Sequence, residues 1–133
     1  MLNMQKLFLI IGSLLAGLAV ALGAFGAHGL KKLAGADPET VAIYQTGVQY
    51  QMYHALALLA IGMLAERIAG SLVHYAGFFF MAGIVFFSGS LYLIASLRAT
   101  NKVVSATIGI MTPIGGLLFI TGWMLLLVAF IRK

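Results

Sequence analysis

This sequence has no cysteine and very little charge. The absence of cysteine excludes disulfides, cysteine metal sites and thiol chemistry. Charged residues make up 8% of the chain and hydrophobic residues 62%, against roughly 25% and roughly 45–50% in a soluble domain. A membrane-spanning helix takes about 20 residues, so 133 residues allow about four such helices with short links. The composition therefore predicts an all-α integral membrane protein with four transmembrane helices in a compact bundle, forming a single domain, residues 1–133.

Four apolar segments account for the expected spans, at approximately residues 7–27, 46–66, 72–97 and 106–130. The first has about 20 apolar residues, longer than a usual signal-peptide core, so we expect it to remain as an uncleaved span. Asp37-Pro38-Glu39 marks a helix start well before the second span. We therefore expect residues 38–46 to form an interfacial helical extension, with Tyr44 on an apolar face that lies along the membrane surface.

The basic residues stand at the ends of the apolar segments. Eight lysines and arginines against three acids give a formal net charge of +5. At such positions basic residues bind lipid headgroups and set topology, so we expect membrane lipids as partners and no nucleic acid. Alternating spans place both termini and the 66–75 link on one side, and the 28–45 and 98–105 links on the other. The positive-inside rule leaves the orientation undecided, because each side carries four basic residues: Lys6, Arg67, Arg132 and Lys133 on one, and Lys31, Lys32, Arg98 and Lys102 on the other.

Small residues gather on the first span. One helical face carries Gly12, Ala16, Ala19, Gly23 and Gly26, and beside it lie Ser13, Gly17, Ala21 and Ala24. Small residues at this spacing let helix backbones approach closely, which drives helix association in lipid. Packing within the monomer is the favoured interpretation, because the first span has to pack somewhere; an oligomer interface is the alternative. The predicted helix-packing residues are Gly12, Ala16, Gly17, Gly23, Gly26, Gly115 and Gly116.

The most polar stretch of the chain, residues 44–54, precedes residues 55–65, which are all apolar or small. Counting about 20 residues back from Ala65 places the membrane edge near Thr46, so the glutamines, tyrosines and histidine that follow lie at membrane depth. Polar side chains there are costly unless they face protein, water or one another. We favour a structural network between helices, with a ligand, ion or proton site as the alternative.

The other three spans carry their polar residues in the same leaflet as this stretch. The candidate polar pocket consists of His28, Gln49, Tyr50, Tyr53, His54, Ser88, Ser90, Tyr92, Thr112 and Pro113. Pro113 removes a backbone donor and frees the carbonyl of Gly109. Gly29 is placed to end the first helix beside His28. The agreement of four helices on one leaflet predicts a polar pocket or network that opens toward the 28–45 and 98–105 links.

Several motifs resemble a known family. They are Gly-Ala-Phe-Gly-Ala-His-Gly at residues 23–29, Tyr-Gln-Thr-Gly at 44–47, Gln-Met-Tyr-His-Ala-Leu at 51–56, Phe-Ser-Gly-Ser-Leu-Tyr at 87–92, and Thr-Pro-Ile-Gly-Gly at 112–116 with Gly122-Trp123. Over nearly its whole length the chain resembles the family catalogued as domain of unknown function 423, the YgdD-like small bacterial membrane proteins related to eukaryotic transmembrane protein 256. The resemblance implies a four-span protein of the bacterial inner membrane and no particular biochemical role.

The residues favour a non-enzymatic membrane protein over an enzyme. Phosphate loops, hydrolytic triads and acidic metal clusters are absent, and His28 and His54 alone are a weak signal for haem, so we expect no catalytic residue, metal or cofactor. Small-residue faces and short links favour a homo-oligomer or an accessory subunit of a larger membrane complex. The alternative is a small-solute or ion transporter or channel that uses the region of His54, Tyr50 and Pro113. Against it, no acid lies inside any span, which removes the carboxylate that usually couples protons or cations to transport.

Overall fold

The structure, a computed structural model, describes residues 3–30, 32, 35–65, 67–68 and 70–132. Its helical segments are α1 (Met4–Phe25), the π-helical η1 (Gly26–Leu30), α3 (Pro38–Leu64), α4 (Leu72–Gly83), the π-helical η2 (Ile84–Ser88), α5 (Gly89–Ala99) and α6 (Ala106–Ile131). The segments α4, η2 and α5 follow one another without a break, so they form one long helix, called here the α4–α5 helix. The described residues contain no strand, and the predicted all-helical fold with four main helices is confirmed.

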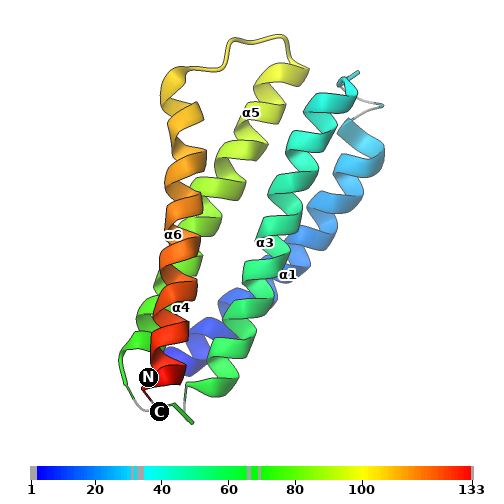
Figure 1. The fold of residues 1–133 in the computed structure, drawn as a ribbon. Coiled ribbons are helices and arrows are strands. Elements are labelled where there is room, and N and C mark those ends of the chain that lie inside the picture. The colour runs from blue at the N-terminus through cyan, green and yellow to red at the C-terminus, as the bar shows by residue number, and fades with distance from the viewer. Residues whose placement is uncertain (1–2, 31, 33–34, 66, 69, 133) are drawn as a thin grey trace.

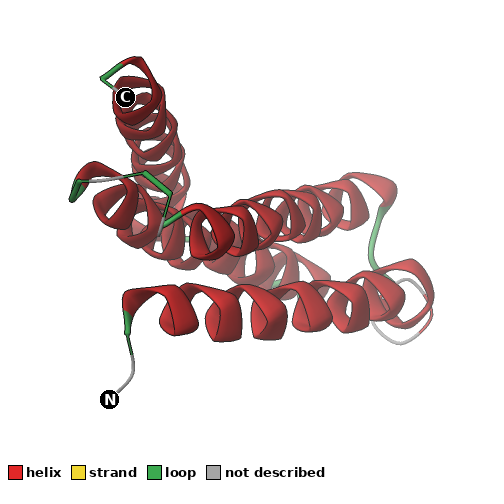
Figure 2. Cartoon of the chain, turned by 90° about the horizontal axis from the view of Figure 1, so that it is seen from below, coloured by secondary structure: helices red, strands yellow, loops and turns green. Residues whose placement is uncertain are grey.

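The helices form two antiparallel pairs, α1 with α3 and the α4–α5 helix with α6 (Figure 1). Both chain ends and the link between α3 and α4 lie at one end of the molecule, called here the termini end (Figure 1). The other two links lie at the opposite end, the loop end, as the predicted alternation of helices requires (Figure 1). Because α1 packs chiefly on α3 and α6 chiefly on the α4–α5 helix, α1 and α6 lie on opposite sides of the molecule (Figure 2).

Three of the helical segments are long and apolar enough to cross a membrane: Met4–Leu30, Leu72–Ala99 and Ala106–Ile131. The fourth helix, α3, has 27 residues and therefore a length of about 40 Å, but its polar residues keep it outside that set. α3 lies between α1 and the α4–α5 helix, where its polar face is shielded from lipid. The predicted end of the second span, Glu66, lies outside the described residues, and α3 itself ends at Leu64.

The start of α3 follows its sequence signal. The Asp37 Oδ1 atom accepts a hydrogen bond from the Thr40 N–H at 2.7 Å, and Pro38 occupies the first turn. These contacts confirm the predicted cap, because a side-chain oxygen there satisfies one of the N–H groups that a helix start leaves unpaired.

Two local predictions at the loop end are wrong. Gly29 does not end the first helix, because the chain continues through η1 to Leu30 and the described glycines with positive φ lie elsewhere. Tyr44 does not lie along the membrane surface, since only 4% of it is exposed. Its ring lies 5.1 Å from that of Tyr92 and fills the space over Gly26, so this part of α3 packs onto η1 and α5.

Two apolar cores lie along the molecule, with polar side chains between them. The termini-end core includes Phe8, Leu58, Phe80 and Phe119, and the loop-end core includes Ala19, Tyr44, Val48 and Ala95. Between the two, along α3 and the α4–α5 helix, lie buried Gln51, His54 and Ser88. The fold therefore places the polar part of the sequence inside the protein, at the middle of the helices.

Candidate functional site

The candidate site is the polar layer, defined as Gln51, His54, Ser88, Ser90, Tyr92, Thr112 and Trp123. Gln51 connects three helices within it and is only 3% exposed. Its Nε2 atom donates to the Leu15 carbonyl of α1 at 2.8 Å, and its Oε1 atom accepts from the Tyr92 hydroxyl of α5 at 2.8 Å. One amide thus fixes α3 against neighbours on both sides, with a donor and an acceptor that are both used.

A second connection joins η2 to α3. The fully buried Ser88 donates its hydroxyl to the Gly47 carbonyl at 2.7 Å. A Cβ atom at Gly47 would lie 2.9 Å from the Tyr92 ring, so the two helices approach closely at this point only because residue 47 has no side chain. The π-helical turns were not predicted, and η2 is the segment that carries Ser88 toward α3.

A third connection joins α5 to α6. The Ser90 hydroxyl donates to the Phe87 carbonyl at 2.8 Å, and its oxygen lies 2.6 Å from the Thr112 hydroxyl oxygen. Because the serine hydrogen is already directed at the carbonyl, Thr112 is the donor of the second bond. A serine that bonds to its own helix and to the neighbouring helix stabilises both, since lipid offers neither group a partner.

His54 is held in one neutral tautomer. Its Nδ1 atom lies 2.8 Å from the Tyr50 carbonyl, which can only accept, so Nδ1 carries the hydrogen. Its Nε2 atom accepts from the Trp123 indole N–H at 3.2 Å, so Nε2 carries none. The imidazole is stacked on Phe119 with ring centroids 3.5 Å apart and planes 8° apart, and it meets the Phe80 ring edge to face. The histidine is therefore enclosed by aromatic rings with both nitrogens in use.

Of the ten residues predicted for the polar pocket, five belong to the polar layer and a sixth, Tyr50, touches it. The other four, His28, Gln49, Tyr53 and Pro113, are exposed and lie outside the polar layer. Tyr50, 39% exposed, reaches it through its carbonyl and lies with its ring 4.5 Å from that of Phe87. His28 has its Nδ1 atom 3.4 Å from the Ala24 carbonyl of its own helix. The remaining five residues belong to the polar layer as hydrogen-bonding partners.

Gln51, Trp123 and the backbone acceptors of the polar layer are not among the residues predicted for the polar pocket. Trp123 is 49% exposed, and its indole N–H is the donor to His54. An indole N–H at membrane depth needs an acceptor, and this was the available signal. The carbonyls of Leu15 and Gly47 carried no signal, since every residue has a carbonyl.

The polar layer is closed by its own hydrogen bonds. Every buried side-chain nitrogen or oxygen in the described part of the chain has a hydrogen-bond partner. No three histidine, aspartate or glutamate residues come together in that part. The bonds of the polar layer connect α1, α3, the α4–α5 helix and α6 near the middle of the helices.

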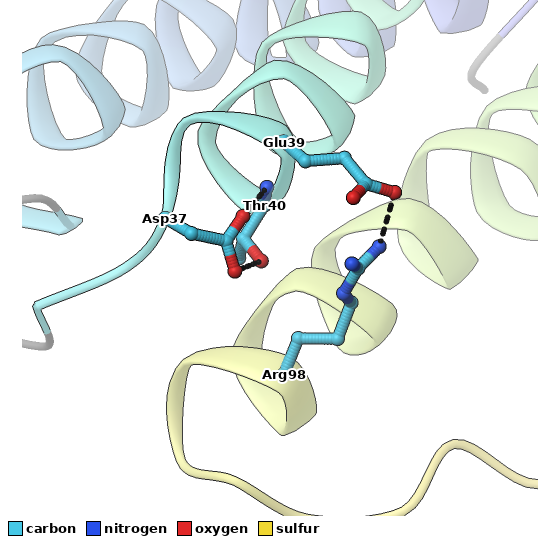
Figure 3. Close-up of polar contacts among 4 residues, drawn as sticks. All are labelled: Asp37, Glu39, Thr40 and Arg98. Atoms are coloured by element: carbon cyan, nitrogen blue, oxygen red, sulfur yellow. Dashed lines mark hydrogen bonds and ion pairs between the residues drawn. The ribbon is translucent and has the colours of Figure 1, made fainter.

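A separate group of charged and polar residues joins α3 and α5 at the loop end (Figure 3). The Asp37 carboxylate accepts from the Thr40 N–H at 2.7 Å and from the Thr40 hydroxyl at 3.0 Å, and these bonds lower the pKa of Asp37. Arg98 donates from Nη1 to the Glu39 Oε1 atom at 3.0 Å (Figure 3). This hydrogen bond and the positive charge lower the pKa of Glu39. The pair is solvent-exposed, so it links the helix ends weakly.

The predicted helix-packing residues have three kinds of surroundings. A Cβ atom would meet a neighbouring helix or ring closely at Gly12, Gly23, Gly26 and Gly115. Ala16 is half-buried, and Gly116 has only ordinary contact with the Phe87 ring at 4.0 Å. Gly17 is exposed, and nothing lies within 4 Å of a Cβ atom placed there. The first span therefore has an inner small-residue face that packs on α3, and Gly17 lies on a different face.

Long apolar helices around buried polar side chains define a helical integral membrane protein. A family described as "Protein of unknown function (DUF423)" matches residues 22–116, and the chain belongs to this family. The UPF0382 membrane protein YwdK of Bacillus subtilis is 43% identical over 130 residues, covering 96% of this chain and 98% of that relative. The UPF0382 membrane protein SAB0533 of Staphylococcus aureus is 45% identical over 125 residues, covering 94% and 95%. No solved structure matches the chain.

These findings confirm the family predicted from the sequence motifs. They also confirm a membrane location, because the relatives are named membrane proteins and three helical segments here can cross a bilayer. The relatives are bacterial, so the membrane is the bacterial plasma membrane, the inner membrane of the prediction.

Proposed function

We propose that the protein is a non-enzymatic assembly module of the membrane, which acts by docking the outer face of α1 on another membrane helix. The other helix belongs to a second copy of this chain or to a larger membrane complex. The observation that carries the proposal is a second small-residue face on α1, which the protein's own helices leave open. We call it the outer α1 face and define it as Ser13, Gly17, Ala21 and Ala24.

The outer α1 face is distinct from the face that packs on α3. Gly12, Ala19 and Gly26 of the inner face are buried, whereas all four residues of the outer face are exposed. Ser13, Gly17 and Ala21 are spaced four residues apart, so they line one side of the helix. Packing within the monomer therefore accounts for the inner face and leaves the outer face without an internal role.

An open glycine within a helix weakens that helix unless something approaches it. Glycine costs about 0.5–1 kcal/mol relative to alanine in a helix interior, and Gly17 gains no compensating contact within the chain. In lipid, helices associate where small residues four apart let two backbones come close. A second helix on the outer α1 face would use the groove that Ser13, Gly17 and Ala21 leave.

The polar layer supports a structural role over transport. His54, which the transport alternative needs, has both ring nitrogens engaged and is enclosed by Phe80 and Phe119. Tyr50 and Pro113, the other expected elements of a path, are exposed. We therefore expect His54→Ala to lower thermal stability without changing any solute or ion flux in liposomes. A flux that depends on His54 would instead support the transport alternative.

The test compares Gly17→Leu with Gly89→Leu in protein released gently from its own membranes. Gly89 is the matched control, because it is also helical and exposed, and nothing lies within 4 Å of a Cβ atom placed there. It differs in that the residues four positions before and after it on the helix, Val85 and Leu93, are large. Native mass spectrometry of the unaltered protein is expected to give a discrete oligomer or a complex with larger subunits. Gly17→Leu should release monomers, and Gly89→Leu should not. A monomer in the unaltered protein, or equal effects of the two variants, would contradict the proposal.

A further inference from the structure

Two clefts lie at the termini end and share one wall residue. The first has a volume of about 310 Å³ and lies between the start of α4, at Ser71, and the end of α6, at Arg132. The second has a volume of about 130 Å³ and lies between α3 and α6. Val73, which is buried, is a wall residue of both clefts. We call them the outer cleft and the inner cleft.

The inner cleft is lined entirely by apolar surface. Its walls include Ala57 and Ile61 of α3 and Leu126 and Phe130 of α6. Trp123 also lines it, but its indole N–H donates to His54, so its only polar atom is used inside the protein. From Trp123 to Phe130 the wall extends about 10 Å along α6. A cleft of this shape and polarity fits a segment of hydrocarbon chain.

The outer cleft adds polar and charged groups where α6 ends. Arg132 is the last described residue and stands directly after the apolar helix Ala106–Ile131. An arginine guanidinium can donate two parallel N–H bonds to one phosphate group. The Ser71 hydroxyl makes no capping bond to α4, so it can donate into the outer cleft.

We propose that the two clefts together bind one anionic phospholipid. Arg132 and Ser71 hold the phosphate of the headgroup, and the inner cleft takes part of one acyl chain. The order of the groups supports this occupant, because a positive charge at a helix end is followed inward by apolar surface, as in a lipid of the surrounding bilayer. A soluble phosphate would leave the inner cleft unused.

The two clefts contribute differently to this binding. An acyl chain that enters the inner cleft leaves one apolar environment for another, so the inner cleft contributes shape rather than a hydrophobic gain. Selectivity for a negative headgroup then comes from Arg132, since anionic lipids attract basic residues at the membrane surface. Removing this charge should therefore abolish the preference for anionic lipid and leave contact with lipid in general.

Trp123 provides the measurement, because it is the only tryptophan of the chain and lines the inner cleft. The full-length protein is reconstituted in phosphatidylcholine vesicles. In one series they contain increasing fractions of brominated phosphatidylglycerol, and in the other increasing fractions of brominated phosphatidylcholine; the bromine atoms on the acyl chains quench the fluorescence of a neighbouring indole. Half-maximal quenching is expected at a mole fraction of brominated phosphatidylglycerol about threefold lower than that of brominated phosphatidylcholine. The Arg132→Gln variant should make the two curves coincide. Lys6→Gln, which removes an exposed charge from α1 at the same end, should keep them apart.

Three results would overturn the proposal. The first is that the two quenching curves coincide in the unaltered protein, and the second is that they stay apart in Arg132→Gln. The third is that Lys6→Gln removes the difference between the curves as completely as Arg132→Gln does. Inorganic phosphate, added with chloride adjusted to constant ionic strength, separates the two sources of phosphate. Quenching by brominated phosphatidylglycerol should be unaffected by it, and relief of quenching would assign the outer cleft to soluble phosphate instead of lipid.

Discussion

In the termini-end core aromatic rings lie over glycines of the neighbouring helix, whereas in the polar layer side chains bond to the backbone of the neighbouring helix. A Cβ atom at Gly77 would lie 2.5 Å from the Phe8 ring, and one at Gly122 would lie 2.5 Å from the Phe80 ring. In the polar layer, Gln51 and Ser88 instead reach the carbonyls of Leu15 and Gly47. Both regions bring helices close together, one by shape and the other by directed bonds.

The difference reflects the solvent in which these helices pack. In lipid an apolar side chain gains little from moving inside, so burial alone does not decide which faces meet. A ring over a glycine fits only where the opposite residue lacks a side chain, and a hydrogen bond requires one particular depth. The termini-end core thus decides which faces approach, and the polar layer fixes the register between them.

The largest expected effect tests close packing, at the contact between α6 and η2. A Cβ atom at Gly115 would overlap the backbone of Phe87, which cannot move aside as a flexible side chain can. We expect Gly115→Ala to lower the free energy of unfolding by about 3 kcal/mol. Gly116→Ala is the matched control, since its Cβ atom would lie 4.0 Å from the Phe87 ring, and it should be neutral or stabilise by up to about 1 kcal/mol.

Unfolding of both variants in detergent micelles, titrated with a denaturing detergent, measures this difference. Equal changes for the two neighbouring glycines would show that helix propensity, rather than close approach, governs this contact.

The second prediction tests the directed bonds. Gln51→Leu keeps the side-chain volume but removes the additional bond to the Leu15 carbonyl and leaves the Tyr92 hydroxyl without its partner, and we expect a loss of about 2 kcal/mol. Tyr92→Phe alone removes one bond and should cost about 0.6–1 kcal/mol. The double variant has no unpaired tyrosine hydroxyl, so it should be less destabilised than the sum of the two single variants. Additive free energies in the same unfolding assay would mean that the two residues do not interact.

The smallest expected effect concerns the carboxylates of Asp37 and Glu39 at the loop end, outside both regions. The pKa values of Asp37 and Glu39 are lowered in the folded protein, so their contribution to stability is complete above the ordinary carboxyl pKa. It is lost as the pH falls through the lowered values. We expect the thermal unfolding midpoint to decrease from pH 6 to pH 3, and Glu39→Gln to make that decrease shallower. An equally steep decrease in Glu39→Gln would exclude the ion pair with Arg98 as a contributor.

For the polar layer, the sequence predicts that a network exists but does not identify its members. The run of glutamine, tyrosine and histidine from residue 49 to 54 cannot face lipid cheaply, so a polar network was predictable. The residues that form this network were not predictable, because Gln49 and Gln51 are chemically identical and only two positions apart. Only the packing of α3 between α1 and the α4–α5 helix buries Gln51 and leaves Gln49 exposed.

By itself, the sequence determined the helical membrane class, the main helices and the start of α3, because these depend on local composition and on backbone groups near the cap. The tertiary structure alone decided which small-residue face of α1 packs inside, where the π-helical turns fall and that Trp123 meets His54. The physical reason is that small residues suit both faces of α1 equally and that the acceptors are backbone carbonyls, which no sequence pattern marks.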